Sequence, residues 1–170
     1  MIELERTFLA KSLPDLRSSE STEIIDIYIP KETEHPTLRI RKLGDIYEMT
    51  KKTPVKDDDS SKQLEQTIVL SEDEFNSLRT LDGKVTHKIR YFYRLNNKVM
   101  EIDVFQGNLK GLVLVDVEFD KEETMNEFEM PDFCLCEVTQ ETFLAGGMLC
   151  GKTYDDIEND LERFNYKKIM

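Results

Sequence analysis

The sequence predicts a mainly β protein of the α+β class: one domain over residues 1–170, built as an eight-stranded antiparallel β-barrel, or tunnel, with flanking helices. Eight short segments alternate apolar and polar residues, which is typical of strands. Helical patterns fall between and after these segments, and neither a repeat nor a change in composition marks a second domain. Closing the sheet gives all eight strands a hydrogen-bonding partner on both sides.

Each predicted strand is a short run with apolar side chains at every second position. The eight runs cover residues 2–9, 23–29, 37–42, 46–52, 63–70, 86–95, 98–105 and 112–119. The Asn96-Asn97 pair separates the sixth and seventh runs and predicts a tight hairpin turn. Residues 53–62 are rich in Asp, Ser and Lys and predict a polar loop.

Helices are predicted at four places. Ser71 and Glu74 form the sequence of a capping box, which predicts that a helix begins there. Residues 121–128 and 139–149 predict two short helices. Apolar residues at helical spacing predict a last helix over residues 153–165.

The overall charge limits the class of partner. With a net charge of −12, the chain is a poor candidate for sequence-independent binding of nucleic acid, which requires a basic face. A local cluster of Arg and Lys can still bind a small polyanion, such as a triphosphate or a nucleotide. The sequence does not determine the oligomeric state, and a homodimer remains open.

Apolar runs are too short to cross a membrane, and the charged start of the chain does not resemble a signal peptide. We therefore expect a cytoplasmic protein without membrane contact. The three cysteines, Cys134, Cys136 and Cys150, are an odd number and are expected to be reduced thiols. A zinc site is not expected, because His35 and His87 are isolated from other ligands at zinc-binding spacing.

The polar half of the strand alternation carries an unusual number of like charges. Residues two apart on a strand point to the same face of the sheet. The like-charged pairs at this spacing are Glu3/Glu5, Arg39/Arg41, Lys88/Arg90, Glu101/Asp103 and Asp116/Glu118. Lys52 and Glu65 extend the pattern, next to Thr50 and Gln63. A solvated face explains any one pair, but like charges about 7 Å apart do not stabilise each other, and five such pairs favour a ligand.

The chemistry of such a ligand follows from the side chains. Carboxylate pairs can hold a hard divalent cation through oxygen ligands, and Arg and Lys pairs can bind phosphate oxygens. A barrel that brings acidic strands opposite basic strands would hold metal on one wall and polyphosphate on the other. The apolar halves of the strands would then face outward, under the helices.

These segments resemble the CYTH domain, or triphosphate tunnel metalloenzyme, family. The family opens with Glu-x-Glu-x-Lys, to which Glu3-Leu4-Glu5-Arg6-Thr7 corresponds. The resemblance continues in order through Leu38-Arg39-Ile40-Arg41, Thr50-Lys51-Lys52, Lys88-Ile89-Arg90-Tyr91, Glu101-Ile102-Asp103-Val104-Phe105, Leu114-Val115-Asp116-Val117-Glu118-Phe119 and Glu137-Val138-Thr139. It implies a tunnel of eight antiparallel strands and covers essentially the whole chain.

The resemblance also implies roles for the charged residues. The residues implied to bind Mg²⁺ or Mn²⁺ are Glu3, Glu5, Asp116 and Glu118. Those implied to bind the triphosphate are Arg39, Arg41, Lys52, Lys88 and Arg90. Glu65 and Asp103 would complete the acidic wall, by holding a second metal or by orienting the basic residues. In the working mechanism, a carboxylate such as Glu5 or Glu118 positions and deprotonates the attacking water.

Thr7 departs from the family pattern, in which this position is Lys, and Ser61-Lys62-Gln63-Leu64-Glu65 departs from the family's Arg-x-Glu-x-Glu, so that one Arg is lost and one carboxylate becomes the amide of Gln63. The function expected from the resemblance is metal-dependent hydrolysis of a phosphoanhydride bond, with inorganic tripolyphosphate as substrate. The alternatives are a non-catalytic module that binds polyphosphate or nucleotide, a thiamine triphosphatase and a class IV adenylyl cyclase.

Overall fold

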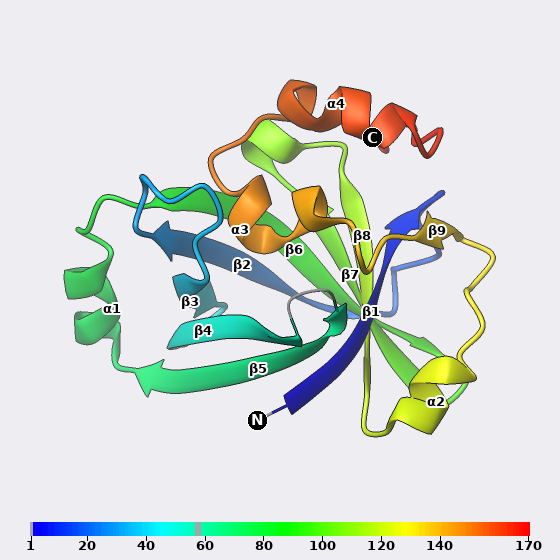
Figure 1. The fold of residues 1–170 in the computed structure, drawn as a ribbon, viewed down its shortest axis with the longest axis horizontal. Helices are drawn as coiled ribbons and strands as arrows, with labels where there is room; N and C mark the ends of the chain where they lie inside the picture. Colours follow the sequence, from blue (N-terminus) through cyan, green and yellow to red (C-terminus); the bar gives the residue numbers. More distant parts are fainter. Residues whose placement is uncertain (1, 57–58) are drawn as a thin grey trace.

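The computed structural model describes residues 2–56 and 59–170 and contains a closed antiparallel barrel (Figure 1). The barrel strands are β1 (Ile2–Ala10), β2 (Glu20–Ile29), β3 (Leu38–Leu43), β4 (Ile46–Lys56), β5 (Asp59–Leu70), β6 (Lys84–Leu95), β7 (Lys98–Phe105) and β8 (Val113–Phe119). They are ordered β5-β4-β3-β2-β6-β7-β8-β1, and pairing of β5 with β1 closes the circle. The predicted fold class is confirmed.

Two strands pair with different parts of β1 on the side where the barrel closes. Residues 2–4 of β1 pair with β5, whereas residues 8–10 pair with a ninth strand, β9 (Cys134–Glu137). Between them, Glu5 and Arg6 pair only with β8 among the described residues, whereas the Thr7 carbonyl also accepts a hydrogen bond from the Val138 N–H, just beyond β9. The barrel wall is therefore interrupted beside the middle of β1, where the charged motif lies.

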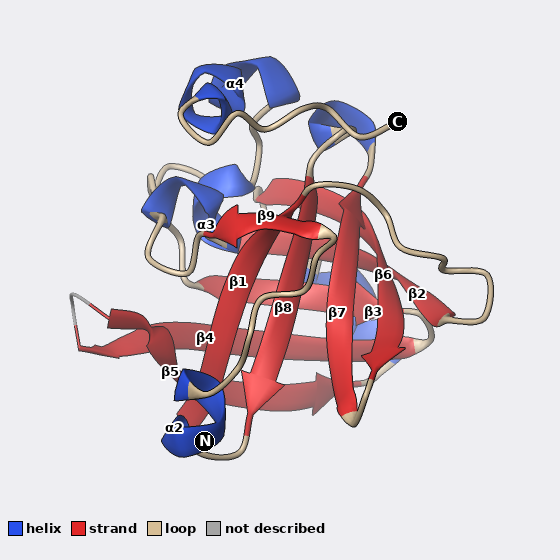
Figure 2. Ribbon diagram, turned by 90° about the vertical axis from the view of Figure 1, so that its right-hand side faces the viewer, coloured by secondary structure: helices blue, strands red, loops and turns tan. Residues whose placement is uncertain are grey.

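Strand alternation separates a polar interior from an apolar exterior, as the sequence predicted. On β8, Val115 and Val117 point outward and are fully buried, while Asp116 and Glu118 point into the barrel. Apolar side chains on the outside pack against Met125 of α2 (Glu122–Asn126) and, at the opposite end of the barrel, against Ile157 of α4 (Tyr154–Glu162). Figure 2 shows these two helices at opposite ends.

The remaining helices are short. α1 (Glu72–Leu78) begins with the predicted capping box and buries Phe75 against Ile27 and Ile40. The 3₁₀ helix η1 (Gly107–Leu109) links β7 to β8. η2 (Thr142–Leu144) and α3 (Gly146–Leu149) follow β9. No described helix has the length and apolar character required to span a membrane.

Three expectations need correction. Residues 53–62 are not a loop throughout, because β4 continues to Lys56 and β5 begins at Asp59; residues 57–58 lie outside the described part. The single helix expected over residues 139–149 is instead η2 followed by α3, because Ala145 adopts a non-helical conformation between them. β9 was not predicted. The Asn96-Asn97 turn is confirmed, with Asn96 at a φ of 54°.

Candidate functional site

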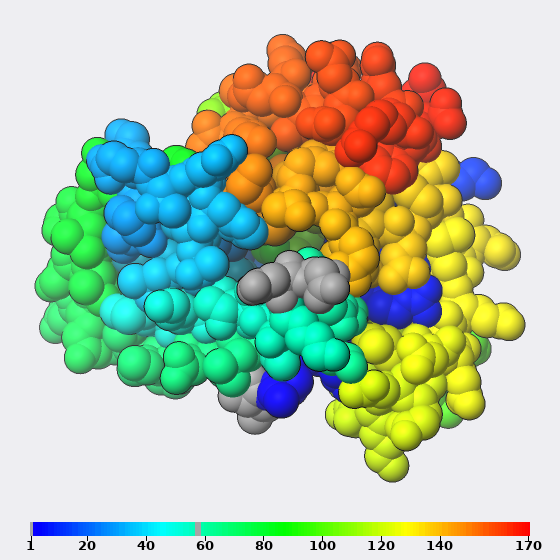
Figure 3. Space-filling view, viewed as in Figure 1, coloured from blue at the N-terminus to red at the C-terminus, as the bar shows by residue number. Residues whose placement is uncertain are grey.

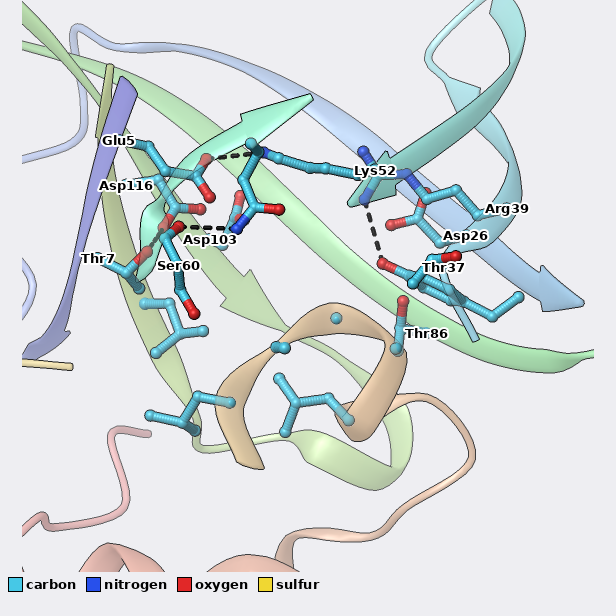
Figure 4. Close-up of a pocket in the computed structure, with 18 of the residues that line it drawn as sticks. Glu5, Thr7, Asp26, Thr37, Arg39, Lys52, Ser60, Thr86, Asp103 and Asp116 are labelled. Carbon is cyan, nitrogen blue, oxygen red and sulfur yellow. Dashed lines mark hydrogen bonds and ion pairs between the residues drawn. The ribbon is translucent and has the colours of Figure 1, made fainter. Parts of the chain in front are cut away.

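A cavity of about 300 Å³ occupies the interior of the barrel, and all eight barrel strands contribute side chains to it (Figure 4). The eleven site residues expected from the sequence all line it: Glu3, Glu5, Arg39, Arg41, Lys52, Glu65, Lys88, Arg90, Asp103, Asp116 and Glu118. Glu3, Glu101 and Glu118 also line a second pocket, beside the start of β1. The structure therefore brings together residues separated by more than a hundred positions.

Three adjacent strands, β7, β8 and β1, form an acidic wall. Strand register places Glu5 directly opposite Glu118, and Glu101 directly opposite Asp116. Burial raises the pKa values of Glu5 and Glu118, and neighbouring carboxylates raise them further. Burial likewise raises the pKa of Glu101 to about 7, with Asp116 and Glu118 adding to the effect against Arg90. Like charges held directly opposite one another destabilise a sheet unless a cation lies between them.

Lys52 on β4 is a basic residue that contacts this acidic wall directly. Lys52 Nζ lies 2.8 Å from Glu3 Oε2 and 2.8 Å from Glu5 Oε2. Burial would lower the pKa of Lys52, but the two carboxylates outweigh it and raise the value. The lysine therefore stays charged between two acids.

Asp103 accepts hydrogen bonds from both basic residues of β6, Lys88 and Arg90. Arg90 donates from Nε and Nη2 to the two carboxylate oxygens of Asp103, each at 2.7 Å, and Lys88 donates to the same carboxylate. Arg90 also pairs with Glu101. Burial of Asp103 favours its neutral form, but Arg90 and Lys88 together hold its pKa at about 2. These hydrogen bonds fit one of the two roles expected of Asp103, that of orienting the basic residues.

The β3 arginines face a residue that the sequence reasoning missed. Asp26 on β2 is buried and accepts hydrogen bonds from Arg41 Nε at 2.6 Å and Nη2 at 2.9 Å. Although burial opposes ionisation, Arg41 and Arg39 hold the pKa of Asp26 well below its usual range. A single charge within the apolar run from Ile24 to Ile29 was the available signal, but its partner lies on another strand.

Arg39 is bound differently. Its Nη1 donates to the Tyr28 hydroxyl at 3.1 Å, and its Nε lies 3.8 Å from Asp26 Oδ1. This Nε is buried and has no hydrogen-bond partner among the described residues. Tyr28 is a second residue that the sequence reasoning missed, and burial raises the pKa of its hydroxyl.

Two of the residues that depart from the family pattern, Thr7 and Gln63, make hydrogen bonds to nearby groups. Thr7, in place of a lysine, donates from Oγ1 to Asp116 Oδ1 at 2.7 Å. Gln63, in place of a carboxylate, donates from Nε2 to the Ser60 carbonyl at 2.8 Å. Both residues line the cavity and are uncharged there.

The acidic wall has the chemistry of a site for a hard divalent cation. Glu3, Glu5, Asp116 and Glu118 offer carboxylate oxygens, the ligands that Mg²⁺ and Mn²⁺ prefer, and the Glu5–Glu118 opposition calls for a positive charge. In residues 2–56 and 59–170, no three Asp, Glu, His or Cys side chains converge into a formed metal group. Lys52 instead pairs with Glu3 and Glu5. The donor types therefore fit, and binding would require these carboxylates to turn toward the ion.

The fold and site together define a class: barrels whose charged interior combines a carboxylate wall with a cluster of Arg and Lys. The sequence matches no family model. It is 32% identical over 143 residues to the inorganic triphosphatase of Nitrosomonas europaea, covering 83% of this chain and 91% of that protein. The chain belongs to the CYTH, or triphosphate tunnel, family.

Solved structures show the same architecture. A crystal structure of an inorganic triphosphatase superposes with a TM-score of 0.64 at 28% identity, covering 88% of this chain and 95% of that one. A candidate adenylate cyclase from Bacillus halodurans superposes with a TM-score of 0.54 at 13% identity, covering 99% of this chain and 92% of that one. The second likeness concerns the fold alone.

Proposed function

We propose that this protein is a divalent-metal-dependent triphosphatase that hydrolyses a phosphoanhydride bond of inorganic tripolyphosphate inside the barrel. The observation that carries the proposal is the convergence of five basic side chains from three strands opposite a continuous acidic wall. The 32% identical relative, which is an inorganic triphosphatase, supports the same substrate.

The balance of charges in the cavity supports a requirement for metal. Among the described residues, nine carboxylates and five Lys or Arg side chains line the cavity. A triphosphate, itself strongly negative, would enter a site with excess negative charge. Mg²⁺ or Mn²⁺ held by Glu3, Glu5, Asp116 and Glu118 would neutralise both the carboxylates and the phosphates, and would polarise a phosphate oxygen.

The other residues have distinct tasks in this proposal. Arg and Lys donate hydrogen bonds to phosphate oxygens and stabilise the charge that spreads over the equatorial oxygens during transfer. Glu5 or Glu118 accepts the proton of the attacking water, a role suited to a carboxylate whose pKa is raised. Water attacks phosphorus, the bridging P–O bond breaks, and tripolyphosphate yields pyrophosphate and orthophosphate.

Phosphate release from tripolyphosphate tests the proposal, with Mg²⁺ or Mn²⁺ and with excess EDTA. We expect release only with metal, and a loss of several orders of magnitude in kcat for Glu118→Gln without a change in fold. Thiamine triphosphate, ATP and triphosphorylated RNA, assayed alongside, compare substrates, and product analysis with ATP detects cyclisation. Full turnover in EDTA would overturn the metal requirement, and binding without phosphate release would identify a binding module.

A cytoplasmic location is also part of the proposal. Cys134, Cys136 and Cys150 are free thiols, and free thiols are the usual state of cysteine in a reducing compartment. This feature supports the location independently of the catalytic argument.

A further inference from the structure

Arg39 differs from the other basic residues of the cavity. Each of the other four has a carboxylate partner within hydrogen-bonding distance. Arg39 instead donates to a neutral hydroxyl, that of Tyr28, and its buried Nε has no hydrogen-bond partner among the described residues. Buried donors without a partner are rare in folded proteins, and a bound water or a ligand oxygen usually completes them. Among the five basic residues, Arg39 therefore gives up the fewest carboxylate hydrogen bonds when a phosphate oxygen binds.

The Tyr28 side chain, which binds Arg39, packs closely against the backbone of α3. A Cβ atom on Gly146 would lie 2.1 Å from the Tyr28 hydroxyl oxygen, so only glycine leaves room for that hydroxyl. The next residue, Gly147, approaches the loop before β3 equally closely: its Cβ would lie 2.2 Å from the Pro36 carbonyl oxygen. Figure 3 shows the segment that contains α3, in orange, against the light-blue loop beside the hollow.

Gly146 of α3 thus contacts Tyr28, and Tyr28 contacts Arg39 at the cavity. β2 and β3 pair with Tyr28 directly opposite Arg39, so the hydroxyl is next to the guanidinium by strand register. Tyr28 is 5% exposed, and both residues line the cavity. The tyrosine ring is thus held between the backbone of α3 and the arginine.

We propose that Tyr28 is a positioning residue for substrate: its hydroxyl, seated against Gly146, holds the Arg39 guanidinium in place at the cavity wall to bind a phosphate oxygen. The ligand assumed here, tripolyphosphate, rests on the proposed function. Tyr28 takes no part in bond breaking, so its loss acts on binding more than on the chemical step.

The first test is Tyr28→Phe, which removes the hydroxyl and keeps the ring. We expect the KM for tripolyphosphate with Mg²⁺ to rise about threefold to tenfold, the range for one lost hydrogen bond, and kcat to stay within about twofold. Tyr166→Phe is the matched control. That hydroxyl is equally buried, at 5% exposure, but bonds the Val113 N–H and the Gly111 carbonyl outside the cavity. It should lower the melting temperature and leave KM unchanged.

The second test examines the contact with α3. Gly146→Ala should raise KM about tenfold or more, because the new methyl group displaces Tyr28. In the Tyr28→Phe background, the nearest remaining atom is the ring carbon at 3.1 Å, so the ring needs to move by only a few tenths of an ångström and Gly146→Ala should add much less. Gly147→Ala, which meets the Pro36 carbonyl, controls for movement of α3, and its effect should be the same in both backgrounds.

The outcomes distinguish this proposal from the proposed function. An unchanged KM in Tyr28→Phe, or an equal effect of Gly146→Ala in both backgrounds, overturns the positioning role even if wild-type protein hydrolyses tripolyphosphate. If wild-type protein binds tripolyphosphate without hydrolysis, calorimetric affinities replace KM in the same cycle. The positioning role then stands or falls on those affinities, although the proposed hydrolysis has failed.

Discussion

Glu101 provides a test of the electrostatics of the acidic wall. Its carboxyl is buried beside Asp116, Glu118 and Asp103, and these surroundings raise its pKa from 4.5 to about 7 despite the pairing with Arg90. A raised pKa in the folded state means that folding favours the protonated form. The stabilisation is complete below the unfolded value of 4.5 and is lost as the pH rises through 7.

The size of the effect follows from the displacement of the pKa. The pKa of Glu101 differs between the unfolded and folded states by about 2.5 units. At about 1.36 kcal/mol per unit, this corresponds to about 3 kcal/mol in the free energy of unfolding. Glu101→Gln keeps the shape of the protonated acid and cannot ionise, and Arg90 retains its two hydrogen bonds to Asp103. The variant should therefore be more stable than the wild type at pH 8 by up to about 3 kcal/mol, and equally stable near pH 4.5.

Urea denaturation followed by circular dichroism measures this difference, with EDTA present to remove stray cations. At pH 8 the variant should also melt up to about 6–12 °C higher, from about 2–4 °C per kcal/mol in a domain of this size. Glu127→Gln, at the exposed end of α2, should show no pH-dependent difference. A Glu101→Gln variant that is equally stable, or less stable, at pH 8 would refute the reasoning.

Three further outcomes are expected. Arg41→Ala leaves the buried carboxylate of Asp26 without its main partner and should lower the free energy of unfolding by about 3–5 kcal/mol in urea denaturation, whereas exposed Lys121→Ala should change it little. Arg39→Ala should weaken tripolyphosphate binding by about 1.5–3 kcal/mol in calorimetry, and wild-type affinity would exclude Arg39 from the site. Tripolyphosphate with Mn²⁺ should raise the melting temperature more than orthophosphate with Mn²⁺. A ligand at a hundredfold excess over its Kd adds about 2.7 kcal/mol to the free energy of unfolding. Equal protection by the two anions would mean that the charged pairs bind no triphosphate.

Ion pairs between the two walls relieve part of the repulsion in the ligand-free barrel. Like charges within one wall do not stabilise each other. Lys52, Lys88 and Arg90 instead pair with the carboxylates opposite them. The remaining repulsion is concentrated in the carboxylates of β7, β8 and β1, where the pKa values are raised. In the proposed function, Arg and Lys would exchange these internal partners for phosphate oxygens when tripolyphosphate binds.

The eight strands could be predicted because alternation is a local property. Residues such as Glu3 and Glu5 share a face of the strand whatever the neighbouring strands are. The repeated like charges on that face therefore indicated the inward-facing residues before any pairing was known. The capping box at Ser71 was equally local, and its helix is present.

Features that depend on long-range pairing could not be predicted in this way. Residues 53–56 look like a loop in isolation, but they form strand because β4 and β5 pair beyond Lys52. The short β9 exists only because β1 offers it a free edge. In the same way, Gly146 and Gly147 lie within the helix predicted over residues 139–149, and the sequence gives no reason for glycine there. The close approach of Tyr28 and Pro36 supplies the reason.

The sequence by itself determined the barrel class, the charged interior and the eleven expected residues that line it, because strand periodicity sets the face that each side chain occupies. Only the tertiary structure decided which charges meet. Asp26 binds Arg41 because β2 lies beside β3, and Arg39 keeps a donor unpaired because its neighbour in register is Tyr28. Ion pairs and buried donors depend on distances of a few ångströms between strands, and those distances are set only when the barrel closes.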